Sequence, residues 1–137
     1  MITARFPFQP GTGGRGDSVL MPVLPLTLQL DAQRIEVPAL ADSGSALNVL
    51  PWSVGLKLGA VWERLDTPIK LTGSLGALEA RALIVEGIIA DLPAVRLVFA
   101  WTQSDAVPVL LGQVNFFMEF DVCFFRKAGV FDVSTGK

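Results

Sequence analysis

Asp42 has the surroundings best suited to chemistry among the thirteen acidic residues of the chain. Its neighbours are apolar, small or hydroxylic, and no cation lies near it in the sequence. A carboxylate in such a place must be hydrogen-bonded by its own loop or be protonated. Gly44 allows a tight turn and a close approach of another chain, while Ser43 and Ser45 can donate hydroxyl hydrogen bonds that orient the carboxylate. A carboxylate held in this way can act as a general acid or base.

A simpler interpretation of the same residues is a turn between two strands. Asp42 would then bond its own loop in an Asx turn, and a motif this short matches many sequences by chance. The local chemistry leaves both interpretations open.

The absence of histidine restricts the chemistry. The chain has no His and a single Cys, Cys123. Ser-His-Asp and Cys-His nucleophiles therefore cannot be built from it, and neither can a zinc site of the usual His and Cys type. If the chain hydrolyses a substrate unaided, its acid and base must be carboxylates. We expect no metal and no cofactor.

Composition predicts a folded protein that binds neither nucleic acid nor membrane. The net charge is −2 and the sequence holds no cluster of Lys and Arg. The chain is 51% hydrophobic and 18% charged, which favours a folded domain that self-associates. The N-terminus lacks the features of a signal peptide, no apolar stretch is as long as a membrane span, and a lone Cys fits a reducing compartment. We expect a cytoplasmic protein.

A β-hairpin should position Asp42. Apolar residues alternate with other residues over 24–30 and again over 35–39, which is the period of strands with one buried face. The second of these strands leads directly into the Asp42 loop. Residues 1–23 are expected to form an N-terminal strand and a Gly-rich flexible loop, and residues 24–137 to form the main domain.

The rest of the chain predicts further short strands. A second hairpin is expected around the turn Gly73-Ser74-Leu75-Gly76, between strands at 69–72 and 78–85. About seven strands with close turn signals predict an all-β barrel or sandwich with one or two short helices. The other expected elements are strands at 95–101, 107–111, 120–125 and 130–133, a helical turn after residue 52, and a helix at 113–119.

The ordered set of motifs resembles the retropepsin-like aspartic peptidases. In that family Asp-Ser/Thr-Gly-Ala/Ser stands between two apolar strands, and residues 37–50 match this pattern. About 65 residues further on, Leu110, Leu111 and Gly112 resemble the apolar-apolar-Gly element that closes the ψ-shaped loop beneath the catalytic Asp.

Two further segments extend the resemblance to residues 24–133. The turn at 73–76 lies where the family has its flap, and residues 116–122 look like the helix-to-strand exit of bacterial members. Two departures are Gln113, where Arg, Met or Asp is more familiar, and the absence of Tyr.

The resemblance implies a closed small β-barrel of the retropepsin-like acid protease type. It implies that Asp42 is catalytic, that residues 43–45 support its loop, and that the 73–76 flap pairs with an extended peptide as an added strand. Apolar subsites would come from Leu47, Leu75 and Leu78.

The resemblance also implies a homodimer. In this family two carboxylates share one proton around a water, because two adjacent like charges cannot both ionise. The chain has one Asp-Ser-Gly-Ser loop, so a second Asp42 must come from an identical chain across a two-fold axis. Ser43 would brace the two loops across that axis. The expected activity is endopeptidase cleavage of a peptide or protein substrate.

Two alternatives stay open. The first is a non-catalytic dimeric binding or scaffold module with the same fold. The second is an unrelated small β-barrel that binds an apolar ligand.

Several other features of the sequence are weaker indications of a functional site. Residues 11–16 match G-x-G-x-x-G but lack the strand-turn-helix context of a dinucleotide site. Cys123 alternates with apolar residues and is expected in the core, and Asp121 is expected to be structural, near a strand start. Core or dimer-interface positions are expected for Phe116, Phe117, Phe120, Phe124 and Phe125.

Overall fold

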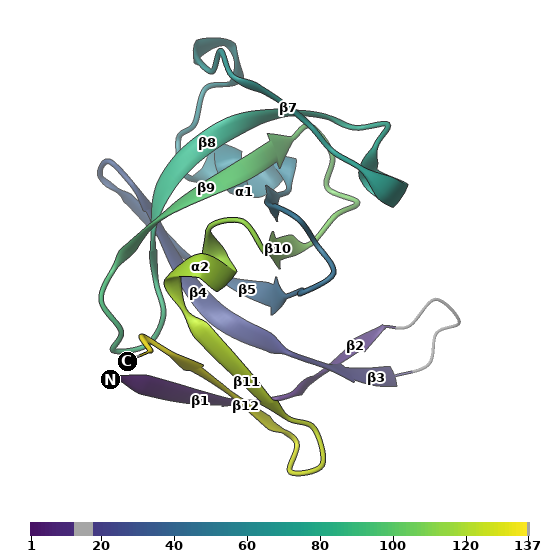
Figure 1. The fold of residues 1–137 in the computed structure, drawn as a ribbon. Helices are drawn as coiled ribbons and strands as arrows, with labels where there is room; N and C mark the ends of the chain where they lie inside the picture. Colours follow the sequence, from purple (N-terminus) through teal and green to yellow (C-terminus); the bar gives the residue numbers. More distant parts are fainter. Residues whose placement is uncertain (13–17, 137) are drawn as a thin grey trace.

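A β-barrel forms the body of the molecule in the computed structural model, which describes residues 1–12 and 18–136 (Figure 1). The main sheet has seven strands in the order β4-β5-β10-β6-β9-β8-β7, and β4 also pairs with β8. Six of the strands therefore close on themselves, which confirms the expected all-β barrel. The strands are β4 (Val23–Leu30), β5 (Gln33–Ala41), β6 (Asn48–Leu50), β7 (Pro68–Lys70), β8 (Glu79–Ile88), β9 (Val95–Thr102) and β10 (Val109–Leu111).

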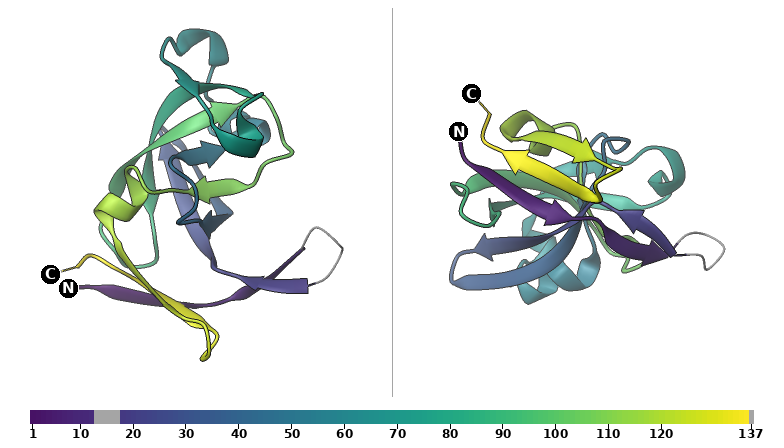
Figure 2. Two further views of the ribbon diagram at one scale, coloured as in Figure 1. Left: turned by 45° about the vertical axis from the view of Figure 1, so that its right-hand side comes forward. Right: turned by 90° about the horizontal axis from the view of Figure 1, so that it is seen from below.

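A second sheet, which we call the terminal sheet, lies at one end of the barrel (Figure 2). It has the strand order β1-β12-β11, formed by β1 (Thr3–Pro7), β12 (Val130–Ser134) and β11 (Asp121–Phe125). Between β1 and the barrel, β2 (Gln9–Thr12) pairs with β3 (Ser18–Met21). Strand β2 therefore covers residues 9–12 of the segment 9–18 in which a Gly-rich flexible loop was expected, and residues 13–17 lie outside the described residues.

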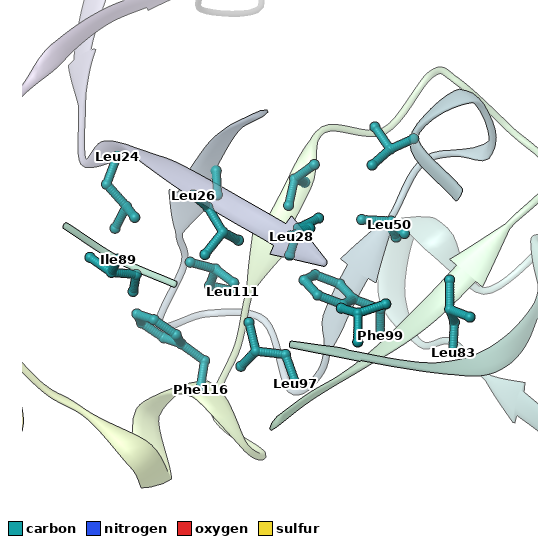
Figure 3. Packing of buried hydrophobic residues seen from close by; sticks show 14 of the residues in the cluster. Leu24, Leu26, Leu28, Leu50, Leu83, Ile89, Leu97, Phe99, Leu111 and Phe116 are labelled. Carbon is teal, nitrogen blue, oxygen red and sulfur yellow. The ribbon is translucent and has the colours of Figure 1, made fainter. Parts of the chain in front are cut away.

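Alternation along the strands builds the core. Leu24, Leu26 and Leu28 on β4 are fully buried inside the barrel, as the period of two predicts (Figure 3). Each buried side chain of this size contributes roughly 1.5–3 kcal/mol. A second, smaller apolar cluster consists of Val49, Leu71, Ala80, Ala100, Val107 and Leu110.

The helices are short. They are α1 (Trp52–Lys57) and α2 (Phe116–Glu119), accompanied by the 3-10 turns η1 (Trp62–Arg64) and η2 (Gly73–Leu75). Helix α2 begins later than the predicted residue 113, because Asn115 has φ 82°, which no right-handed helix allows. None of the described helices is long and apolar enough to cross a membrane.

Cys123 is exposed, so its predicted core position is wrong. It lies on β11, where Val122 packs against the core and the next side chain must point to the opposite face. The predicted place of Asp121 is confirmed, because it begins β11. The aromatic residues of this region differ in exposure. Phe116 and Phe120 are buried, whereas Phe124 and Phe125 are 42% and 41% exposed.

Candidate active site

Asp42 follows directly on the last residue of β5, at the end of a firmly held strand. Its backbone N–H donates to the carbonyl of Leu111 at 2.9 Å, and Ala41 N–H donates to Pro22 O at 3.0 Å. Strand β10 pairs in parallel with β5 over Val109 to Leu111. The backbone that carries the Asp42 carboxylate is therefore held by β10 and β4, the strands on the two sides of β5.

The Asp42 carboxylate organises the turn that follows it. Gly44 N–H donates to Asp42 Oδ1 at 2.9 Å, and Ser45 N–H donates to Asp42 O at 3.0 Å. This is the Asx turn of the simpler interpretation, and the side chain is still only half-buried. A Cβ atom at Gly44 would lie 3.2 Å from Asp42 Oδ1, so glycine avoids a tight side-chain contact with this oxygen. An Asx turn and an accessible carboxylate are compatible here.

The two serines act differently from expectation. The Ser45 hydroxyl donates to Leu47 O at 2.7 Å and not to the carboxylate, so it stabilises the loop itself. Ser43 is exposed, and its hydroxyl makes no hydrogen bond to a described residue. The backbone N–H of Gly44 thus orients the carboxylate, as the serine hydroxyl groups were expected to do.

Gly112 lies directly beneath the Asp42 loop. A Cβ atom there would come within 2.4 Å of Leu47 O and 2.8 Å of Ser45 O, so only glycine fits. The next two residues fasten the loop, since Gln113 N–H donates to Ser45 O and Val114 N–H to Ala46 O, each at 2.9 Å. The apolar-apolar-Gly run therefore supports the Asp42 loop from below.

Gln113 adds a contact from its side chain. Its Nε2 donates to Ser43 O at 2.7 Å. The residue that departs from the familiar pattern thus holds the backbone next to Asp42.

Asn48 is a supporting residue that the sequence interpretation missed. It is fully buried, and its Oδ1 accepts from Gly112 N–H at 2.8 Å. Its Nδ2 donates to Val98 O at 3.1 Å and to Asn115 Oδ1 at 3.0 Å. A lone amide in an apolar run is the signal that could have revealed it, because buried polar groups need partners.

Asn115 completes this network. Its Oδ1 also accepts from Val98 N–H at 2.8 Å, and its Nδ2 donates to Arg96 O at 3.0 Å. The two amides together connect β6, β9 and the start of α2, and so fix the element that lies under the Asp42 loop.

A cleft of about 450 Å³ opens beside Asp42. In Figure 1, the loop between β5 and β6 and the turn after β7 lie on the same side of the barrel. The cleft brings together three regions that the sequence singled out: the Asp42 loop, the turn at 73–76, and Leu110. Its lining is Asp42, Gly44, Ser45, Ala46, Leu47, Val49, Lys70, Leu71, Thr72, Gly73, Leu75 and Leu110.

The other sequence-predicted residues lie around the cleft and do not line it. Gly76 closes the turn through its N–H bond to Gly73 O at 3.1 Å. Leu111 and Gly112 are buried behind the loop, and Leu78 packs against the smaller apolar cluster. The side chain of Ser74 lies outside the description.

A second hollow, of about 390 Å³, reaches Asp42 from another direction. We call it the outer hollow; it is open and lies between the Asp42 loop and the terminal sheet. Its lining is Phe8, Met21, Pro22, Leu40, Ala41, Asp42, Ser43, Phe124 and Arg126. Asp42 is the one carboxylate in the lining of the cleft and of the outer hollow.

The volumes of the cleft and of the outer hollow do not distinguish them from other hollows on the surface. A hollow of about 420 Å³ on β4 and β5 holds Glu36 as its single charged residue. No group of three or more His, Cys, Asp or Glu in the described residues is arranged to hold a metal. The position of Asp42, shared by two spaces, is what distinguishes the site.

Comparison with known proteins identifies the fold. No family model and no curated protein matches the sequence. The structure is similar to the crystal structure of a retropepsin-like aspartic protease from Rickettsia conorii, with a TM-score of 0.61. The alignment covers 96% of this chain and 91% of that chain, at 11% sequence identity. The chain therefore has the retropepsin-like fold.

Proposed function

We propose that the chain is an aspartic endopeptidase whose active site contains two Asp42 carboxylates, one from each subunit of a homodimer. The observation that carries this proposal is the place of Asp42, between a cleft that can take an extended peptide and an open hollow that a second subunit can cover. The retropepsin-like fold supports the same assignment.

The chemistry needs a pair of carboxylates with one proton between them. The ionised carboxylate takes a proton from a water molecule while the water oxygen attacks the peptide carbonyl carbon. The protonated carboxylate gives its proton to the carbonyl oxygen. In the second step one carboxyl group gives its proton to the amide nitrogen, the other carboxylate takes a proton from a hydroxyl group of the tetrahedral diol, and the C–N bond breaks, which leaves the pair with one shared proton.

The lining of the site supports a second copy as the source of the second carboxylate. Neither the cleft nor the outer hollow contains another Asp or Glu besides Asp42. A closed two-fold dimer brings the same residue of both chains to one axis. Asp42 is half-buried and lines the outer hollow, so it can approach such an axis.

The cleft favours an extended peptide with apolar side chains. Leu47, Leu71, Leu75 and Leu110 provide apolar lining. Strand β7 pairs with β8 and lies at the end of the main sheet, so its other edge can accept a peptide as an added strand.

Exchange of Asp42 tests the proposal. The Asp42→Asn variant should keep its fold and its dimer, seen by circular dichroism and light scattering. It should lose cleavage of a mixed peptide library by several orders of magnitude, since no other carboxylate replaces it. Asp66→Asn makes the same chemical change at an exposed position outside the cleft and the outer hollow and should leave cleavage unchanged. Retained cleavage by Asp42→Asn would overturn the assignment.

The wild-type protein separates the enzyme from the scaffold alternative. Cleavage is expected between about pH 4 and 7, where carboxylate pairs change protonation. A dimer that binds peptides but cleaves none of them over this range would be a non-catalytic module.

A further inference from the structure

One wall of the cleft belongs to a single hairpin, formed by β7, the turn at 73–76 and the start of β8. We call it the cleft hairpin. Its first limb, β7, pairs with β8 over three residues, Pro68 to Lys70, and begins with a residue that has no N–H. One more backbone bond lies just before it, from Ala82 N–H to Thr67 O at 2.9 Å. Strand pairing alone therefore gives the β7 limb little support. The hairpin residues that line the cleft are Lys70, Leu71, Thr72, Gly73 and Leu75.

Arg81 supplies further support at the base of the cleft hairpin. It lies on β8, opposite Pro68 of β7 on one side and opposite Trp101 of β9 on the other. Its Nη1 donates to Trp62 O at 2.7 Å and to Leu65 O at 3.2 Å. Both carbonyls belong to the segment that leads into β7. A side chain from the second limb of the hairpin therefore holds the approach to the first limb.

The guanidinium group of Arg81 also lies over an aromatic ring. Its Cζ is 4.5 Å from the centre of the Trp62 ring, within the distance of a cation–π interaction. Trp62 is buried and packs edge-on against Trp52 at 5.8 Å and against Trp101 at 5.5 Å, and the last two rings stack at 4.7 Å. All three Trp residues of the chain thus form one packed cluster, which we call the Trp cluster. Arg81 connects the cleft hairpin to it.

The geometry of these contacts is specific to arginine. Arg81 is half-buried and forms no ion pair with a described carboxylate. Its partners are two backbone carbonyls and the face of a ring. A planar guanidinium can direct N–H bonds at the carbonyls while its flat side stays on the ring, whereas the ammonium of Lys is a point charge. The contacts therefore fix where Arg81 lies, and with it the base of the hairpin.

We propose that Arg81 is a positioning residue for the substrate: it fixes the base of the cleft hairpin against the Trp cluster and so sets where residues 70–75 stand relative to Asp42. This inference rests on the proposed function, because the cleft is where the peptide would bind. Arg81 does not line the cleft, so it acts on the peptide through the hairpin.

Arg81→Met tests this role, because Met can still pack on Trp62 but lacks the charge and the N–H donors. A displaced hairpin weakens the binding of substrate and transition state alike, so KM for an apolar peptide should rise about tenfold while kcat stays within about twofold of the wild-type value. Arg81→Lys returns the charge and should recover part of the affinity. Arg96→Met, at an exposed position near the other end of β9, should leave KM unchanged.

Hydrogen exchange shows whether the effect is local. In Arg81→Met the amide hydrogens of residues 66–80 should exchange about tenfold faster than in the wild type. Amides of β4 and of the terminal sheet should keep their wild-type rates. Peptide affinity is measured in the Asp42→Asn background, with and without Arg81→Met, so that cleavage does not disturb it. A residue that only stabilised the fold would lower the free energy of unfolding and leave both KM and this affinity unchanged.

The outcomes separate this inference from the proposed function. Peptide binding that Arg81→Met weakens, in a protein that cleaves nothing, would support the positioning role and count against the enzyme. Cleavage with the same KM in Arg81→Met and wild type would overturn the positioning role and leave the enzyme assignment intact. Faster exchange throughout the barrel would also overturn it, because Arg81 would then stabilise the whole fold. A wild-type protein that binds no member of the peptide library would overturn both.

Discussion

The side-chain oxygen of Asn48 accepts a hydrogen bond from the backbone N–H of Gly112 at 2.8 Å, inside the barrel. Gly112 in turn lies against the carbonyls of Ser45 and Leu47. The buried amide thus holds the support on which the Asp42 loop rests. The contact joins two residues that are 64 positions apart in the chain.

Removal of the Asn48 amide should destabilise the protein. Asn48→Ala leaves Gly112 N–H, Val98 C=O and Asn115 Oδ1 without their bonds to residue 48. Buried groups left without partners cost about 1–3 kcal/mol each, so a loss of about 3 kcal/mol is expected. Urea unfolding measures it.

Thr102→Val is the matched control. Thr102 is 1% exposed, and its hydroxyl has no hydrogen-bond partner among the described residues. Replacing the hydroxyl with a methyl group should keep the free energy of unfolding within about 1 kcal/mol of the wild-type value. Equal stabilities of Asn48→Ala and Thr102→Val would contradict the role given to Asn48.

The two glycines of the site should respond differently to alanine. In Gly112→Ala the new Cβ meets backbone carbonyls at 2.4 and 2.8 Å, so the loop must shift and stability should fall. In Gly44→Ala the new Cβ lies 3.2 Å from Asp42 Oδ1, so stability should change less while the turnover number falls. Urea unfolding and peptide cleavage, measured together, check both. A Gly112→Ala protein as stable as Gly44→Ala would contradict this account of the loop.

Acid should weaken the junction of β1 and β12. Arg5 Nε donates to Asp132 Oδ1 at 2.7 Å, and this hydrogen bond, together with the guanidinium charge, lowers the pKa of Asp132. A carboxyl whose pKa is lowered by folding stabilises the protein above its unfolded pKa of about 3.9, and this contribution is lost as the pH falls through the folded value. Asp132→Asn should therefore be less stable than wild type above about pH 5, and the difference should shrink as the pH falls below about 4. Urea midpoints across this range measure it, and a difference independent of pH would contradict it.

Lys70 should influence which peptides bind. It is the one basic residue in the lining of the cleft and makes no ion pair with a described residue. Peptides that carry Glu beside an apolar residue should bind Asp42→Asn more tightly than peptides with Lys there, by up to about fivefold for an exposed charge. Lys70→Glu should reverse the preference, and Lys57→Glu, on α1, should not. An unchanged preference in Lys70→Glu would remove Lys70 from peptide recognition.

Much of the fold could be predicted from local patterns. The alternation of Leu24, Leu26 and Leu28 identifies β4 and its buried face, and the turn at 73–76 identifies the β7–β8 hairpin. The apolar strand before Asp42 and the run that ends at Gly112 were expected to support one loop, and they pair side by side. Short-range periodicity carries this information because strands bury every second residue.

Contacts between distant segments could not be predicted in the same way. Asn48 and Asn115 are 67 residues apart, and only the folded barrel brings their amides to 3.0 Å. The exposure of Cys123 depends on which face of β11 packs against the core, and β11 carries apolar residues on both faces, so its sequence does not reveal this. The Ser45 hydroxyl was expected to bond the Asp42 carboxylate, but in the folded loop it donates to Leu47 O.

The central claim is that one active site needs Asp42 from two chains, and mixing two proteins tests it most directly. Wild-type protein at fixed concentration is equilibrated with an equal amount of Asp42→Asn, and cleavage is measured per wild-type chain. If both carboxylates are required, random pairing should lower this activity to about one half, and further Asp42→Asn should lower it toward zero. Activity per wild-type chain that stays constant at every ratio, while mixed dimers are shown to form, would contradict the claim.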